Sequence, residues 1–355
     1  MNMFTRTGTK RPHRQGLTLI ELVLVLVILS LLATVAIEMV EPQVDQTRFE
    51  TTQRTVTNVQ RAIFDREQLT DGTTIQSGFL VDMGRLPQAR ADVADATKLN
   101  LSELWVQSAL PSYAAVQAVT ANITTTNAGS LLDADGDSVA QDTNVYLRYG
   151  WRGPYLQLAV GAETLIDGFG HRLSSLTTDA SLSHLRGSGD AAITVVGTSI
   201  YGARSFGRSN VIDVGVNADA YDNDVPRSTS GQMLASSQIS GTVSGTVTYY
   251  TTGATAADIV VQLYYPNGAQ IVVQRASTQA GGAAEIVETT PASVTTYQTF
   301  QFTFRDSSGS EMEFAVGPRV VRAYYKFGDG SQRQSAVTSF TLTSPGNILN
   351  LAINN

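Results

Sequence analysis

The sequence predicts an α+β protein in which a long N-terminal helix packs on a small antiparallel sheet and an all-β sandwich follows. Three observations predict this class. An unbroken apolar run near the N-terminus leads into a seven-residue hydrophobic repeat, which is typical of one long helix. The stretch 71–228 mixes short apolar segments with turn residues. From 236 onward, apolar and polar residues alternate without helical periodicity, which favours strands.

The composition excludes several function classes. The chain has 355 residues, no cysteine, 15% charged residues and a formal net charge of −7. Without cysteine there is no disulfide, no Cys-ligated zinc or iron–sulfur cluster and no thiol nucleophile. The acidic balance argues against binding nucleic acid through bulk electrostatics, so no nucleic-acid partner is expected. At this length we expect more than one folded unit.

Residues 17–37 form a candidate transmembrane helix. The run LTLIELVLVLVILSLLATVAI has 21 residues and would span roughly 31 Å, the hydrocarbon thickness of a bilayer. Four basic residues precede it, and acidic residues follow it from Glu38 onward. The positive-inside rule therefore places residues 1–16 in the cytoplasm and the rest of the chain outside.

Two other interpretations of this run are weaker. A cleaved secretory signal has about 7–15 apolar residues followed by a small-residue cleavage site, whereas this run is longer and Ala33 and Ala36 have the wrong spacing. A plain signal anchor would explain the length but not Glu21. A carboxylate within a membrane span costs free energy and marks function by default, so Glu21 needs a partner.

Residues 15–21, Gln-Gly-Leu-Thr-Leu-Ile-Glu, join the basic leader to the apolar run. This pattern closely resembles the class III signal of type IV pilins and type II secretion pseudopilins, with Leu17 where the family usually has Phe. The resemblance implies that a prepilin peptidase removes residues 1–16 by cutting between Gly16 and Leu17, and then methylates the new amino terminus. It also implies that Glu21 pairs with the terminal amine of a neighbouring subunit, since each charge is costly in a membrane without the other.

The same resemblance implies where the protein lies and what it assembles with. It would be a single-pass protein of the inner membrane with its bulk in the periplasm. Its partners would be other pilin or pseudopilin subunits and an assembly platform in the inner membrane. Cleavage would leave 339 of the 355 residues, far more than a typical pilin head requires.

Residues 38–70 are expected to continue the helix in amphipathic form. Apolar residues recur at seven-residue spacing while the arginines face elsewhere, which predicts a stripe that packs on a globular head. The stripe consists of Phe49, Val56, Val59 and Ile63. The helix is expected to reach about Arg66, and Asp71 and Gly72 are expected to end it.

Residues 71–228 are expected to form the head. The pattern predicts a short helix at 99–109 and strands at 193–196 and 211–216. Gly-Pro-Tyr-Leu at 153–156, followed by Asp-Gly-Phe-Gly-His-Arg at 167–172, resembles the Gly-Tyr-Leu and Asp-Pro-Trp-Gly pattern of major pseudopilins. Gly168 replaces the family's Pro and Phe169 its Trp. We interpret these residues as turns and core aromatics rather than as a ligand site.

Residues 236–355 are expected to form a β-sandwich. Strict alternation at 299–305 places three Phe on one face, and 321–327 repeats the pattern with Arg322, Tyr324 and Lys326 on the opposite face. A turn signal at 266–268 separates two strand candidates. About seven to nine strands without helical periodicity predict a sandwich, with an immunoglobulin-like arrangement as our expectation. The stretch 227–236 is expected to be a short linker.

Two acidic loops are candidate calcium sites. The first, at 217–225, resembles the acidic loop where major pseudopilins bind calcium; carried over, Asp219, Asp222 and Asp224 would be the ligands, and the ion would have a structural role. The second is a Gly-containing turn whose carboxylates could wrap a hard cation, or form a solvated acidic turn instead. Its carboxylates are Asp133, Asp135, Asp137 and Asp142.

No enzymatic motif is found. The sequence lacks H-E-x-x-H, G-x-x-x-x-G-K-[ST] and G-x-S-x-G, and after cleavage only His171 and His184 remain, both in polar turns. The missing motifs predict a non-enzymatic protein, and the resemblance to pseudopilins implies that it is a structural subunit of a type II secretion pseudopilus. The alternatives are a type IV pilin with an exposed sandwich for adhesion, motility or DNA uptake, and a tethered receptor or adhesin that does not polymerise.

Overall fold

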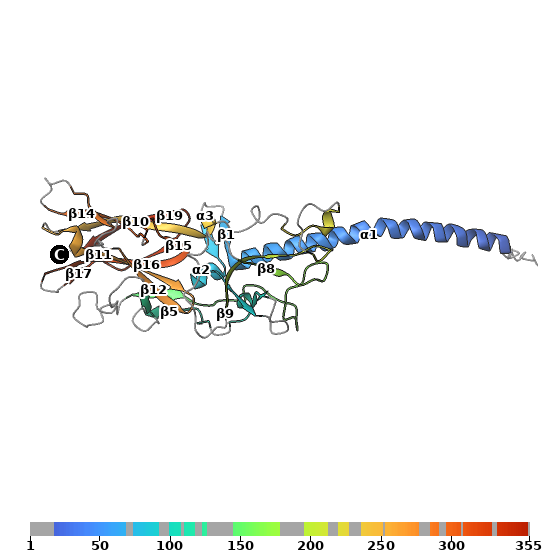
Figure 1. The fold of residues 1–355 in the computed structure, drawn as a ribbon, viewed down its shortest axis with the longest axis horizontal. Coiled ribbons are helices and arrows are strands. Elements are labelled where there is room, and N and C mark those ends of the chain that lie inside the picture. Colours follow the sequence, from blue (N-terminus) through green and yellow to red (C-terminus); the bar gives the residue numbers. More distant parts are fainter. Residues whose placement is uncertain are drawn as a thin grey trace, which may run out of the picture.

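The computed structural model of the chain has an elongated shape. It describes residues 18–68, 74–91, 99–107, 110–117, 123–125, 145–177, 195–211, 219–226, 236–250, 253–276, 285–290, 296–306, 308–328 and 332–353. A long helix projects from one end, a small head surrounds the other half of this helix, and a β domain lies beyond the head (Figure 1). The predicted α+β class is confirmed.

Helix α1 (Leu19–Ile63) has 45 residues and contains Pro42. A capping box begins it: the Thr18 hydroxyl accepts the Glu21 N–H, and the Glu21 carboxylate accepts the Thr18 N–H. Of the helices that the structure describes, α1 is the one long and apolar enough to cross a membrane. The predicted stripe is confirmed, because Val56, Val59 and Ile63 are buried.

The helix ends earlier than the sequence predicts. Ile63 is its last residue, and the expected helix over 65–70 is wrong where the chain is described, because Asp65–Gln68 form strand β1. Strand β1 pairs antiparallel with β2 (Thr74–Ser77). The hairpin folds back onto the helix end so closely that a Cβ on Gly78, which has φ +106°, would lie 2.7 Å from the Ile63 carbonyl oxygen. This tertiary contact fixes the end of the helix.

The head contains a four-stranded antiparallel sheet within the described residues. Its order is β4 (Leu99–Asn100), β3 (Gln88–Ala91), β9 (Val195–Arg204) and β8 (Ser174–Thr177). Beside it, β5 (Ala114–Gln117) pairs with β7 (Tyr146–Tyr149). The short helix α2 (Phe79–Met83) is completely buried between α1 and the β domain. Of the strand predicted at 193–196, the described part begins β9, which continues to Arg204.

One local prediction in the head is wrong, and another falls almost entirely outside the described residues. The helix predicted at 99–109 is strand β4 followed by a single 3-10 turn, Ser102–Leu104. The Leu104 carbonyl accepts the N–H groups of Tyr155 and Leu156, so it is engaged by another segment. Of the strand predicted at 211–216, only Val211 is described, and it lies exposed in a bend.

The C-terminal domain consists of two sheets that share an apolar core, as predicted. One sheet contains β10 (Ser240–Tyr249), β13 (Ile286–Glu288), β14 (Gln298–Thr303), β15 (Glu313–Ala315) and β19 (Gly346–Ile353). The other contains β11 (Ile259–Asn267), β12 (Gln270–Ala276), β16 (Gly317–Lys326), β17 (Gln332–Gln334) and β18 (Thr338–Leu342). Phe300, Phe302 and Phe304 are buried in this core, which confirms their predicted face. The immunoglobulin-like topology stays a prediction.

Head and sandwich are packed together. Strand β6 (Ile123–Thr125), which precedes β7 in the chain, joins the second sheet parallel to β12. A core cluster contains Leu147 and Tyr149 of β7 together with Tyr264 and Val320 of the sandwich. The face of β16 opposite the sandwich core is therefore also covered, and the predicted opposite-face residues Arg322 and Tyr324 are buried. The predicted linker at 227–235 lies outside the described residues.

Head and sandwich also approach each other closely at the end of α2. Gly84 has φ +68°, and a Cβ on it would lie 1.9 Å from the Pro266 carbonyl oxygen. Next to it, the Gly268 N–H donates to the Met83 carbonyl over 2.9 Å. A residue with a side chain at position 84 could not keep this backbone contact, so glycine is required here.

Candidate functional site

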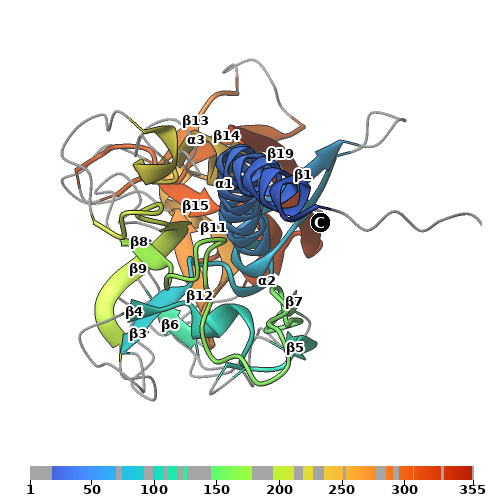
Figure 2. The ribbon, with the colours of Figure 1, turned by 90° about the vertical axis from the view of Figure 1, so that its right-hand side faces the viewer.

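The N-terminal half of α1 is an uncovered apolar surface. Large apolar side chains from Leu19 to Val35 are exposed in the isolated subunit, and none of the most apolar window is buried. This half of the helix projects beyond the head (Figure 1) and is seen nearly end-on in Figure 2. An apolar surface of this size cannot stay in water, so a membrane or the helices of other subunits must cover it.

Glu21 is the single carboxylate on this surface between Leu19 and Val35. Its side chain is exposed and accepts hydrogen bonds from the Thr18 N–H, over 2.9 Å, and from the Thr18 hydroxyl, over 3.0 Å. These bonds lie within the first helical turn and engage no other part of the chain. Glu21 is thus free to meet a cation from outside the subunit. Gly16 and Leu17, the predicted cleavage site, lie outside the described residues.

The acidic loop at 219–226 packs against α1 where the head begins. Arg208 lies between them and donates from all three of its nitrogens: to Asp45 of α1 over 2.7 Å, to Asp219 over 2.6 Å, and to both oxygens of Asp222 over 2.9 and 3.2 Å. We call these four residues the Arg208 cluster. Asp224 is buried and pairs with Arg204.

The backbone of the loop holds Arg208 in this position. Ser205 and Val225 exchange two N–H···O bonds of 2.8 Å, and the Arg208 N–H donates to the Tyr221 carbonyl over 2.9 Å. Between them, Gly207 has φ +62°, and a Cβ there would lie 2.6 Å from the Asn223 carbonyl oxygen. Residues 205–208 and 221–225 therefore form one closely fitted unit.

Charge complementarity within the cluster is visible in the pKa values. Hydrogen bonds to Asp222 and then Asp45 raise the pKa of the Arg208 guanidinium further above its usual range. The backbone N–H of Tyr221, followed by Arg208, lowers the pKa of Asp219 below its usual value. The Arg208 guanidinium and the Asp219 carboxylate therefore stay ionised together at physiological pH.

The Asp-Gly-Phe-Gly-His turn meets the same unit from the other side. Asp167 accepts the N–H groups of Phe169 and His171, and its other oxygen accepts the Ser205 hydroxyl over 2.6 Å. The Gly168 N–H donates to Thr52 of α1, and a Cβ at this position would lie 2.0 Å from the Arg48 carbonyl oxygen. This contact with α1 explains why a glycine stands at 168. The turn is thus engaged in structural contacts, in line with its interpretation from sequence.

The carboxylates of the 219–226 loop do not fit a calcium ion in this arrangement. Asp219, Asp222 and Asp224 each accept hydrogen bonds from an arginine. Among the described residues, no group of three or more His, Asp or Glu side chains is placed to hold a metal ion. Calcium binding at this loop stays a prediction, and the second candidate set, 133–142, lies outside the described residues.

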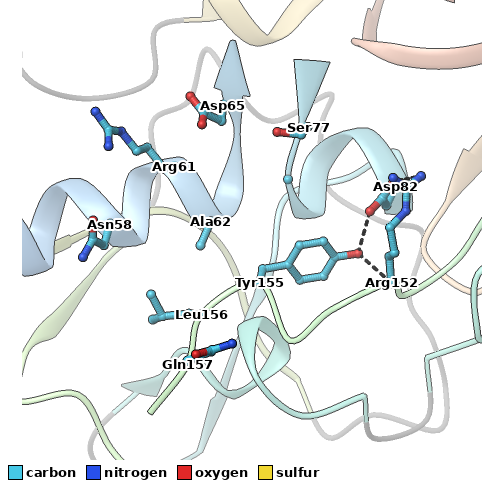
Figure 3. A pocket seen from close by; sticks show the side chains of 11 residues that line it. Asn58, Arg61, Ala62, Asp65, Ser77, Asp82, Arg152, Tyr155, Leu156 and Gln157 are labelled. Atoms are coloured by element: carbon cyan, nitrogen blue, oxygen red, sulfur yellow. Dashed lines mark hydrogen bonds and ion pairs between the residues drawn. The ribbon is translucent and has the colours of Figure 1, made fainter. Parts of the chain in front are cut away.

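A cavity of about 520 Å³ lies where the end of α1, the β1–β2 hairpin, α2 and the 152–157 loop meet (Figure 3). Asp82 of α2 lies at its buried end, where it accepts the Tyr155 hydroxyl over 3.0 Å and pairs with Arg152 over 3.1 Å. Burial raises the pKa of Asp82 above its usual value, although Arg152 and the Tyr155 hydroxyl oppose the shift. Burial, and then the Asp82 carboxylate, raise the pKa of Tyr155.

Asp82 gives the head a predicted pH dependence. Because its pKa is higher in the folded than in the unfolded chain, the folded state binds the extra proton, and stability falls as the pH rises above about 4 through the folded pKa. Asp82→Asn is expected to flatten this part of the curve of unfolding free energy against pH. Thermal unfolding of the full-length protein between pH 4 and 8 measures it. Asp65→Asn, which removes a less buried charge from the same cavity, is the control and should leave the slope in place.

Sequence reasoning did not find Arg208, Asp45 or Asp82. One signal was present for Asp45: positions 45, 49, 52, 56, 59 and 63 follow the alternating four- and three-residue spacing of the buried stripe. A carboxylate at a stripe position is buried and needs a cationic partner. Asp45 and Thr52 are indeed buried there, but the identity of the partner required the tertiary structure.

Comparison with known proteins bears on the N-terminal segment. No curated protein and no solved structure matches the chain significantly. Residues 11–37 match the family model of the prokaryotic N-terminal methylation motif, which covers the predicted cleavage site, Glu21 and the apolar run. The motif implies processing by prepilin peptidase and assembly with other pilin subunits. The chain therefore carries the prepilin signal of the type IV pilin and pseudopilin superfamily, and this signal together with the apolar N-terminal helix supports a membrane-anchored, pilin-like subunit.

Proposed function

We propose that this protein is a structural subunit of a type II secretion pseudopilus. The observation that carries the proposal is the N-terminal half of α1, an uncovered apolar helix that bears one carboxylate at Glu21. Before assembly, this half lies in the inner membrane with the head and sandwich in the periplasm. Assembly transfers it from lipid into a bundle of identical helices.

Glu21 directs this transfer. Cleavage after Gly16 creates an amine at Leu17, and methylation leaves this amine able to carry a positive charge. Among the described residues of the isolated subunit, the partner of the Glu21 carboxylate is Thr18, within its own first turn. A neighbour's terminal amine is a stronger partner, since an ion pair away from water stabilises two charges that are each costly alone.

The head favours the secretion assignment. Its stretches 153–156 and 167–172 resemble those of major pseudopilins, and each connects separate segments of the head. Tyr155 contacts α2 through Asp82, and Asp167 joins the 205–208 segment to the turn on α1. No catalytic role is part of this proposal.

A second candidate is a type IV pilin whose sandwich binds an external surface. The observation that favours it is the place of the sandwich, which lies at the end of the molecule opposite the N-terminal half of α1 (Figure 1). In a membrane-anchored subunit this end points away from the bilayer, where it is accessible to other molecules.

Deletion of the gene, with complementation, separates the two functions. For a pseudopilin we expect secreted proteins to accumulate in the periplasm of the deletion strain while surface pili and attachment remain normal. Loss of surface pili or attachment with normal secretion would replace the first proposal by the second. Complementation with the intact gene is the control for effects on neighbouring genes.

A further inference from the structure

We propose that the Arg208 guanidinium stands in the place of a divalent cation, and that it holds the 219–226 loop on α1 without calcium. This inference concerns the head alone, so it does not depend on the choice between secretion and pilus.

The geometry of the Arg208 cluster is that of a single cation shared by several carboxylates. Asp219 and Asp222 belong to the loop, whereas Asp45 comes from α1, 163 residues before Arg208 in the chain. A guanidinium offers five N–H donors in a planar fork, so it can bridge carboxylates from separate elements as a metal ion does. Lysine, with a compact ammonium group, cannot reproduce this fork.

The cluster differs from an ordinary surface ion pair because one of its carboxylates is buried. Asp45 is 6% exposed and lies on the stripe that packs on the head. Arg48, one turn along α1, is 3.7 Å from Asp45 at its nearest nitrogen, and its side chain is largely exposed. Without Arg208, Asp45, Asp219 and Asp222 would lose the cation that they share.

The loop also contacts α1 through an aromatic pair, which places Arg208 within a larger interface. The rings of Phe49 and Tyr221 pack edge to face with centroids 5.9 Å apart. Tyr221 also gives its carbonyl to the Arg208 N–H. Loss of the guanidinium would therefore loosen an interface that orients the head on α1 close to the end of the membrane span.

A calcium ion would have to displace a guanidinium that donates four hydrogen bonds. Removal of Arg208 leaves Asp45, Asp219 and Asp222 as oxygen ligands of the kind that calcium prefers. The proposal therefore predicts opposite calcium responses for the wild-type protein and for a variant without the arginine.

The test is thermal unfolding of the full-length protein in detergent micelles, with either EDTA or millimolar calcium chloride. Tryptophan fluorescence is a suitable signal because Trp105 and Trp151 pack against the head core. The wild type should unfold at the same temperature in both solutions. Arg208→Ala should unfold about 4–8 °C lower in EDTA and recover part of this loss in calcium.

Two further variants make the result specific. Arg54→Ala removes an exposed arginine of α1 for which the described residues show no ion pair, and it should behave as the wild type. Arg208→Lys keeps a positive charge but lacks the planar fork of donors, and it replaces the alanine variant if that variant does not fold. It should also unfold at a lower temperature than the wild type. Three results would overturn the proposal: a wild-type protein stabilised by calcium, an Arg208→Ala protein as stable as the wild type, or an Arg208→Ala protein indifferent to calcium.

Discussion

Glu21→Ala is expected to abolish incorporation of this protein into filaments while leaving it in the membrane. The alanine helix is more apolar and inserts at least as well, but a neighbour's terminal amine would enter the helix bundle without a counter-ion. Breaking a buried ion pair by removing one partner costs about 3–5 kcal/mol, so incorporation should fall more than about a hundredfold. Quantifying the protein in sheared filaments and in membranes measures this ratio.

Thr18→Ala is the matched control for this experiment. Thr18 shares the capping box with Glu21, so its loss weakens the helix start without removing the carboxylate. We expect near-normal incorporation for Thr18→Ala, and also for Glu41→Ala, which removes an exposed carboxylate from the next part of α1. Wild-type levels of Glu21→Ala in filaments would show that the carboxylate does not direct assembly.

Gly84→Ala is expected to separate the head from the sandwich. The positive φ of Gly84 costs an alanine roughly 1–2 kcal/mol, and the overlap of its Cβ with the Pro266 carbonyl adds about 1–3 kcal/mol. We therefore expect the free energy of unfolding to fall by about 2–5 kcal/mol. The Gly268 amide, which donates to Met83 across this junction, should exchange its hydrogen with solvent much faster.

Gly253→Ala separates backbone strain from overlap. Gly253 has φ +92° but nothing lies within 4 Å of the place its Cβ would occupy. The free energy of unfolding of Gly253→Ala should fall by about 1–2 kcal/mol, because only the backbone is strained. Hydrogen exchange of the Gly268 amide should stay unchanged. Equal losses for the two variants would mean that the contact between residue 84 and Pro266 contributes nothing to the junction.

Sequence periodicity predicted those elements in which one face packs on an apolar core and the opposite face does not. Two such faces were predicted correctly. One is the stripe from Phe49 to Ile63, and the other is the alternation that contains Phe300, Phe302 and Phe304; each packs on one apolar core. The end of α1 was not predictable in this way. The helix ends where Gly78 packs against Ile63. This contact forms only in the folded head, so the local sequence pattern around Ile63 does not show it.

The fusion of head and sandwich and the Arg208 cluster also depend on contacts that no local pattern records. Strand β6 enters the sandwich sheet from the head half of the chain, and Asp45 meets Arg208 across 163 residues. The acidic loop was recognised from its carboxylates, but their counter-ion was sought among metals because the sequence does not show which arginine folds onto the loop.

The mass of the N-terminal peptide of chains recovered from assembled filaments tests the central claim most directly. That claim is that maturation of one subunit creates the cation that neutralises Glu21 of the next. It predicts chains that begin at a methylated Leu17 and lack residues 1–16. Functional filaments built from chains that retain those sixteen residues would contradict it.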